Sequence, residues 1–358
     1  MRRHWIDNLR WVTVLLVLLY HVIYYYNNKG VFGGIDGFGG PQYQDVVMYL
    51  LYPWFMPLLF ILAGMSAKYS LEKRTPKEFI RSRTRKLLVP STIGLFVFQW
   101  MTGYFNTQTA GHVQGLDLLA GVPGPAKFIV WAISGIGVLW FVQDLWLFSL
   151  LIVPLRNLDK TGRCGKLGIV PLILLGVLFW AGEKTLIQDT TESLAGLLNL
   201  YKPLFYIIPF LLGYFVFSHD EVQKKLADVW IPLLACAGTI GIILTVTTFG
   251  QDNTTPQYLG SPLNCLYGWM MCLAMMAWFK AKFDCTNKTS AYLSKSSYGF
   301  YVTHYLFIVS LGYMMKLYTS LPPVAMYLIL GIAVFTLTPA LYELLRRIPV
   351  VRWCIYGE

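Results

Sequence analysis

The chain of 358 residues is 56% hydrophobic and only 13% charged, and it carries a formal net charge of +11 at pH 7. Soluble domains usually have about 25% charged residues, so this composition excludes an ordinary water-soluble protein. It indicates an integral membrane protein. The six cysteines have no paired spacing, which indicates neither a disulfide framework nor a zinc site.

Apolar runs of about 20 residues predict an all-α bundle of ten membrane-spanning helices. The fifth run is shorter than the others. We find no internal repeat and no separate soluble domain, so we expect a single domain over residues 1–358. The predicted spans, in chain order, are 8–27, 46–66, 87–107, 131–154, 167–182, 201–217, 229–249, 261–280, 297–316 and 323–344.

The Lys and Arg residues predict the orientation. With the N-terminus in the cytoplasm, the loops on that side carry 24 of the 29 basic residues. Cytoplasmic loops are enriched in Lys and Arg, so we expect both termini on the cytoplasmic side of the plasma or inner membrane. Topology therefore explains the net positive charge without a nucleic-acid partner. Membrane lipids are expected partners, and the sequence leaves a homo-oligomer open.

Two segments on the opposite side are rich in glycine and predict long loops, 27–45 and 107–127. Such loops can approach a ligand closely or close over it. They can equally be plain connections, and the sequence does not choose between the two.

Ionisable residues inside the predicted spans are the first functional candidates. An unpartnered polar group in hydrocarbon costs roughly 2–7 kcal/mol, so such residues are rare without a role. His21 lies inside the first span, and Arg10 precedes it by eleven residues. That spacing is about three helical turns, which places both on one helix face about 16 Å apart. The alternative interpretation is a structural histidine that is hydrogen-bonded to another helix.

Three further ionisable residues lie within predicted spans. Asp144 must be protonated or must pair with a cation or a histidine. His304 has three neighbouring tyrosines that could satisfy it structurally. Glu343 lies near the inner end of the last span, where pairing with Arg346 or Arg347 explains it. The three tyrosines are Tyr298, Tyr301 and Tyr305.

A basic cluster precedes the third predicted span. Arg81, Arg83, Arg85 and Lys86 lie just before Pro90. Anchoring at the cytoplasmic surface explains most of these residues. Arg side chains also bind phosphates with two parallel hydrogen bonds, which predicts a phosphate-bearing cytosolic ligand.

These motifs resemble acyltransferase family 3, the ten-span membrane acyltransferases that modify carbohydrates. The family places Arg or Lys eleven residues before a His in the first span, as Arg10 and His21 stand in "LRWVTVLLVLLYH". Its basic R-x-x-R patch followed by Pro is similar to "RTRKLLVP" (83–90), where Lys86 replaces the second Arg. Further similar segments make the resemblance cover essentially the whole chain: "WFMPLLFILAGMSAKYS" (54–70), "LWFVQDLW" (139–146), "SYGFYVTHYLFI" (297–308) and "RRIPVVRWCIYG" (346–357).

The resemblance implies O-acylation with cytosolic acyl-coenzyme A as co-substrate and no metal. The acyl group is expected to be acetyl, with succinyl as the alternative, and the acceptor a hydroxyl of a cell-surface or periplasmic glycan. The coenzyme A phosphates would be bound by Arg83, Arg85 and Lys86, with Arg10 beside them. Aromatic residues that could stack on sugar faces are Trp54, Trp140 and Tyr20.

In this interpretation His21 is the general base for the acceptor hydroxyl. A neutral imidazole, with a reference pKa of about 6.5, suits that role at neutral pH. An acyl-imidazole intermediate on His21 is the alternative, which sequence does not separate. Asp144 and His304 are expected to orient His21 or to bind the acceptor.

Two other classes of protein stay open. A polysaccharide exporter or flippase also needs many spans and buried polar groups, but it often shows paired halves, which are absent from this sequence. A purely structural membrane protein is the third possibility. It predicts that replacing His21 changes stability without removing a chemical activity.

Overall fold

The computed structural model describes residues 3–26, 34–35, 37–159, 162–186 and 200–358. Over these residues the chain is helical and contains no β-strand. The α-helices are α1 (His4–Tyr24), α2 (Val46–Leu71), α3 (Pro76–Arg83), α4 (Trp100–Gln114), α5 (Gly124–Ser134), α6 (Trp140–Leu155), α7 (Ile169–Leu186), α8 (Pro203–Leu212), α9 (Asp220–Asp228), α10 (Trp230–Thr248), α11 (Pro256–Leu259), α12 (Pro262–Lys282), α13 (Lys288–Tyr318), α14 (Pro323–Leu345) and α15 (Pro349–Tyr356). Short 3₁₀- and π-helical segments are η1 (Tyr43–Asp45), η2 (Thr84–Leu88), η3 (Leu95–Gln99), η4 (Gly137–Leu139), η5 (Arg163–Lys166) and η6 (Gly213–Phe217).

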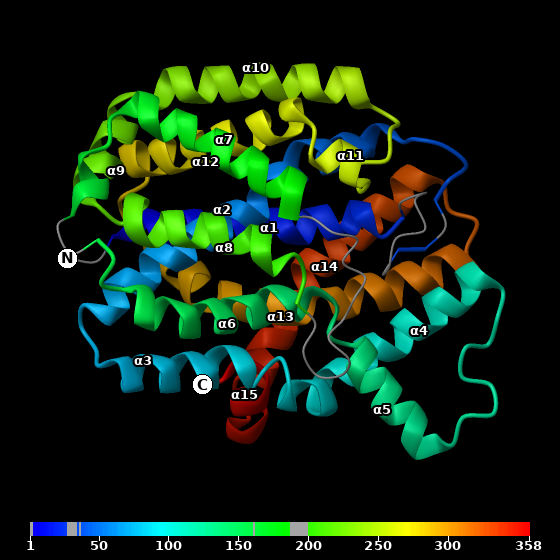
Figure 1. Ribbon diagram of the computed structural model, residues 1–358. Coiled ribbons are helices and arrows are strands. Elements are labelled where there is room, and N and C mark those ends of the chain that lie inside the picture. Colours follow the sequence, from blue (N-terminus) through cyan, green and yellow to red (C-terminus); the bar gives the residue numbers. More distant parts are fainter. Residues whose placement is uncertain (1–2, 27–33, 36, 160–161, 187–199) are drawn as a thin grey trace.

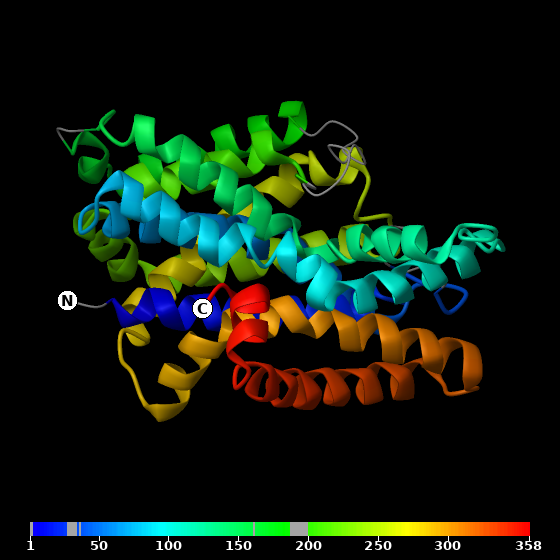
Figure 2. The ribbon, with the colours of Figure 1, turned by 90° about the horizontal axis from the view of Figure 1, so that it is seen from below.

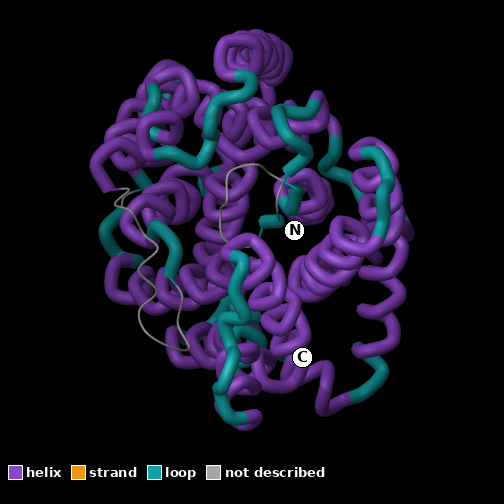
Figure 3. Tube along the Cα trace, turned by 90° about the vertical axis from the view of Figure 1, so that its right-hand side faces the viewer, coloured by secondary structure: helices purple, strands orange, loops and turns teal. Residues whose placement is uncertain are grey.

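The long helices lie side by side with their axes in roughly one direction, as expected for a membrane bundle (Figures 1 and 2). Seen along that direction, the helices are grouped around the middle of the section and do not form a single layer (Figure 3). Helix α1 packs against α2, α12, α13 and α14. Most of α2 and α12 is buried inside the protein, whereas α7, α10 and α14 keep most of their apolar surface exposed. The apolar exterior is therefore the surface that faces lipid.

Seven helical segments of the described chain are long and apolar enough to cross a membrane, so the protein is a multi-pass membrane protein. They correspond to the predicted spans at 8–27, 46–66, 131–154, 167–182, 229–249, 261–280 and 323–344. An eighth arises if α8, η6 and α9 form one span, although that chain bends by 95°. The ten-span count is therefore not confirmed.

The two remaining predicted spans differ from the others for identifiable reasons. Residues 87–107 are divided among η2, η3 and the start of α4, so no single straight helix forms there. Residues 297–316 belong to α13, a helix of 31 residues. Within this stretch His304 and several tyrosines lower the hydropathy, although the length of α13 exceeds what a bilayer requires.

Two predicted boundaries were wrong. The glycine-rich loop expected at 107–127 is helical as far as Gln114, because Gly115 at the C-terminus of α4 adopts a left-handed conformation that ends the helix. The span expected at 131–154 is interrupted: α5 ends at Ser134 and α6 begins at Trp140. Of the loop expected at 27–45, residues 27–33 and 36 lie outside the described residues.

The crossing of α2 with α8 and η6 depends on two glycines. A Cβ atom placed on Gly64 would lie 2.0 Å from the carbonyl oxygen of Phe210. A Cβ atom on Gly213 would lie 2.1 Å from the carbonyl oxygen of Ile61. The two backbones therefore touch on both sides of the crossing, as small residues permit between membrane helices.

We expect Gly64→Ala to destabilise the protein by about 1–3 kcal/mol, because the new methyl group must push the two backbones apart. The matched control is Gly331→Ala in α14, where a Cβ atom meets nothing within 4 Å. Thermal unfolding of both variants in the same detergent measures the effect. Equal midpoints for the two variants would contradict the close crossing.

Candidate active site

His21 lies in the last third of α1 and is half-buried. Its Nδ1 atom lies 2.9 Å from the carbonyl oxygen of Val17, one helical turn earlier. A carbonyl only accepts hydrogen bonds, so Nδ1 carries the hydrogen and Nε2 carries the lone pair. Within the described residues Nε2 has no hydrogen-bond partner. The basic nitrogen of His21 thus keeps an unused hydrogen-bond acceptor.

His304, on α13, lies directly beside His21. It is 0% exposed, and its Nδ1 atom donates to the carbonyl oxygen of Tyr301 at 2.7 Å. That bond leaves Nε2 of His304 as an acceptor, 3.3 Å from Nδ1 of His21. The Nδ1 hydrogen of His21 is therefore shared between the carbonyl of Val17 and the ring of His304. Of the tyrosines considered from sequence, Tyr301 is the one that satisfies His304, through its backbone.

Aromatic rings surround His21 on its other sides. The rings of Tyr20 and Tyr305 have their centres 5.3 Å and 5.4 Å from that of His21. Tyr20 in turn stacks on Tyr24 and Tyr52. Of the predicted sugar-stacking residues, Tyr20 belongs to this group, although it is only 4% exposed. Trp54 is 2% exposed and lies in the same core, and the ring of Trp140 contacts those of Tyr201 and Tyr206 instead.

Asp144 is not brought to the histidines. It is 0% exposed on α6, and both of its carboxylate oxygens are without a hydrogen-bond partner among the described residues. Tyr206 and Tyr301 lie within electrostatic range of it. Among the described residues, Asp144 makes no hydrogen bond, ion pair or ring contact with His21 or His304. Any effect of Asp144 on His21 therefore passes through other residues.

The predicted cationic site forms around Arg10 and Arg83. Nη2 of Arg10 donates to the Ser66 hydroxyl at 2.7 Å, and Nη1 lies 3.1 Å from Asp7. Desolvation, together with the nearby positive charges of Arg10 and Arg74, lowers the pKa of Arg83 to about 10. Arg83 has no acidic partner in the described part of the chain. Arg10 and Arg74 thus lie within electrostatic range of Arg83, a half-buried cation with no acidic partner among the described residues.

The other two residues of the predicted donor site, Arg85 and Lys86, do not belong to this group of cations. Arg85 and Lys86 are exposed, and neither side chain bonds to Arg10 or Arg83. The backbone of this segment is fixed instead, because the Tyr298 hydroxyl donates to the Lys86 carbonyl at 2.8 Å. The C-terminal helix α15, which crosses the long helices (Figure 1), brings Gly357 against Arg85 and Lys86. Tight packing of the C-terminal segment thus positions the cationic cluster.

Glu343 pairs with Arg346 at 2.7 Å, as its position in the sequence predicts. The structure also contains a buried ion pair that the sequence did not predict. Glu183 on α7 and Lys202 before α8 are 8% and 4% exposed, and Nζ lies 3.8 Å from Oε1. Glu183 lies one residue beyond the predicted fifth span, which ended too early. Lys202 has a left-handed backbone (φ +50°), which costs about 1–2 kcal/mol in a non-glycine residue.

These features define a helical membrane protein with a paired histidine inside its bundle. The family model described as "Acyltransferase domain" matches residues 3–343, nearly the whole chain. The chain therefore belongs to acyltransferase family 3, and the protein is a membrane acyltransferase. No match was found among curated proteins or among solved structures. In the described residues no group of three His, Cys, Asp or Glu side chains could hold a metal ion.

Proposed function

We propose that the protein transfers an acyl group from cytosolic acyl-coenzyme A to a hydroxyl of a glycan outside the cytoplasm. Acetyl is the expected group, and succinyl is the alternative. The supporting observation is the tautomer of His21, whose Nδ1 hydrogen is held by Val17 and His304 while Nε2 stays open. A general base requires this arrangement, with the lone pair toward the substrate and the other nitrogen fixed.

The reaction needs two proton transfers, one to His21 and one from it. Nε2 of His21 takes the proton of the acceptor hydroxyl, and the hydroxyl oxygen attacks the thioester carbon. The carbon–sulfur bond then breaks, and the thiolate of coenzyme A receives the proton from the imidazolium. While His21 is charged, the Val17 carbonyl and the lone pair of His304 stabilise its Nδ1–H. His304 is therefore a positioning residue in this mechanism.

The donor phosphates would bind at the cationic cluster of Arg10, Arg74 and Arg83, with the exposed Arg85 and Lys86 near it. The half-buried guanidinium of Arg83 supports this, because a cation without an anionic partner gains most from a bound phosphate. We place this cluster on the cytoplasmic side because most Lys and Arg residues lie in the loops assigned to that side. The pantetheine arm would then extend along α1 toward His21.

His21→Ala should abolish acyl transfer, because general-base catalysis is worth about 10²–10⁴-fold. Proton NMR of the extracytoplasmic glycans from wild type, a null strain and this variant, at matched membrane abundance, measures the esters. Loss of one ester signal in both mutants is expected. An unchanged ester profile, with glycan trapped inside the cell, would favour the exporter instead.

His304→Leu should lower kcat about 10- to 100-fold, because the imidazolium of His21 loses a hydrogen-bond acceptor worth roughly 1.5–3 kcal/mol. His304→Gln should retain more activity, since its amide oxygen can replace Nε2 as acceptor. The KM for acyl-coenzyme A should not change. Equal activity of the two variants would show that His304 acts only by filling space.

Arg83→Ala should raise the KM for acetyl-coenzyme A about 10- to 100-fold with little change in kcat, because it removes binding common to ground and transition states. Arg81→Ala is the matched control, since Arg81 is exposed on the same helix. Initial rates of thiol release by the purified protein separate the two constants. A KM that rises equally in both variants would indicate a diffuse surface charge effect.

A further inference from the structure

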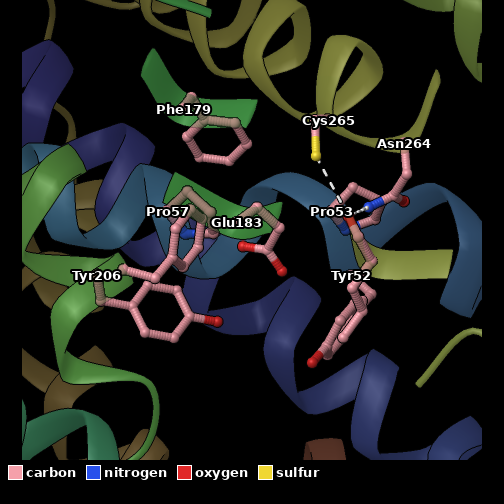
Figure 4. A pocket seen from close by; sticks show the side chains of 10 residues that line it. Tyr52, Pro53, Pro57, Phe179, Glu183, Tyr206, Asn264 and Cys265 are labelled. Atoms are coloured by element: carbon pink, nitrogen blue, oxygen red, sulfur yellow. Dashed lines mark hydrogen bonds between the residues drawn. The ribbon is translucent and has the colours of Figure 1, made fainter. Parts of the chain in front are cut away.

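A small cavity among α2, α7, α8 and α12 contains polar groups that the mechanism above does not use. Tyr52, Glu183, Tyr206 and Asn264 are among the residues that line it. In Figure 4 the phenol oxygens of Tyr52 and Tyr206 point into the space that the carboxylate of Glu183 faces. Its volume of about 10 Å³ accommodates one water molecule or one hydroxyl group.

The polar groups of this cavity are not satisfied by one another. The separation of 3.8 Å between Glu183 and Lys202 exceeds a hydrogen bond, so both groups keep unused bonding capacity. The amide oxygen of Asn264, a residue that is 4% exposed, has no hydrogen-bond partner in the described part of the chain. Buried groups of this kind normally have a partner. The unpartnered oxygen of Asn264 and the long Glu183–Lys202 ion pair beside it leave this cavity with bonding capacity for one more polar group.

The cavity is connected to His21 through aromatic rings. The hydroxyl of Tyr52 lies 3.2 Å from that of Tyr201, and the ammonium of Lys202 lies over the Tyr201 ring at 5.1 Å. The ring of Tyr52 stacks on Tyr20, which contacts His21. Aromatic faces that lead from a polar cavity to a base suit a sugar ring, which is apolar on its faces and polar at its edge.

We propose that this cavity is a binding subsite for one hydroxyl group of a neutral sugar residue in the acceptor. A hydroxyl both donates and accepts, so it can bond Glu183 and Lys202 at once. One carboxylate and one ammonium together carry no net charge, which favours an uncharged sugar over an acidic or basic one. The inference rests on the proposed acyl transfer, and it names the substrate class for that reaction.

The test uses the purified protein in lipid nanodiscs with acetyl-coenzyme A and with de-esterified envelope glycan from a null strain. Ester formed at increasing glycan concentrations gives the KM for the acceptor. We expect Glu183→Gln and Tyr52→Phe to raise this KM about tenfold, the effect of one hydrogen bond to a charged group, while the KM for acetyl-coenzyme A stays constant. Glu221→Gln, on an exposed position of α9, is the matched control.

The double variant Glu183→Gln with Lys202→Gln separates binding from folding, because it leaves no buried charge unpaired. A raised acceptor KM in this folded variant supports the subsite. An acceptor KM equal to that of the wild type, in both the double variant and Tyr52→Phe, would show a purely structural ion pair and overturn the inference. If the wild type forms no ester, acyl transfer itself is refuted, and the subsite with it.

Discussion

One hydrogen atom, on Nδ1 of His21, connects the helices that form the centre of this protein. It is shared between the carbonyl of Val17 on the same helix and the ring of His304 on α13. In a low-dielectric interior an unpaired polar group is costly, so this sharing fixes the ring, the tautomer and the contact between α1 and α13 together. The open Nε2 atom follows from it, and with it the direction from which a substrate must come.

The cost of leaving a polar group unpaired in the interior also explains where the other polar residues lie. The Tyr298 hydroxyl bonds the Lys86 carbonyl, and Arg10 bonds Ser66, so ionisable and polar residues lie where helices meet. Three sites depart from this pattern: the half-buried guanidinium of Arg83, the carboxylate of Asp144 and the cavity beside Glu183. Two of them have a place in the proposed reaction, as donor and acceptor sites. Asp144 has none that the described contacts explain.

The positions of these polar groups also depend on segments whose backbones lie in direct contact. Gly64 and Gly213 allow α2 to touch η6 and α8, which brings Tyr52 on α2 near Tyr201 and Tyr206. The C-terminal Gly357 allows the chain end to pack against Arg85 and Lys86. Both contacts join segments far apart in the sequence. They fix the basic segment and the tyrosine group to which the proposed reaction assigns donor and acceptor binding.

The sequence by itself determined the helical membrane class and the resemblance to the family, and it predicted functional roles for Arg10 and His21, because hydropathy and the eleven-residue spacing are local properties of one helix. It also predicted the Glu343–Arg346 pair, since those residues lie one turn apart. Tertiary structure alone decided that His304 meets His21, that Asp144 bonds to neither histidine, and that Glu183 pairs with Lys202. These contacts depend on how distant helices cross, and a single sequence carries no local signal for that. The break at Gly135–Gly137 likewise interrupts an apolar run whose composition predicts one continuous helix.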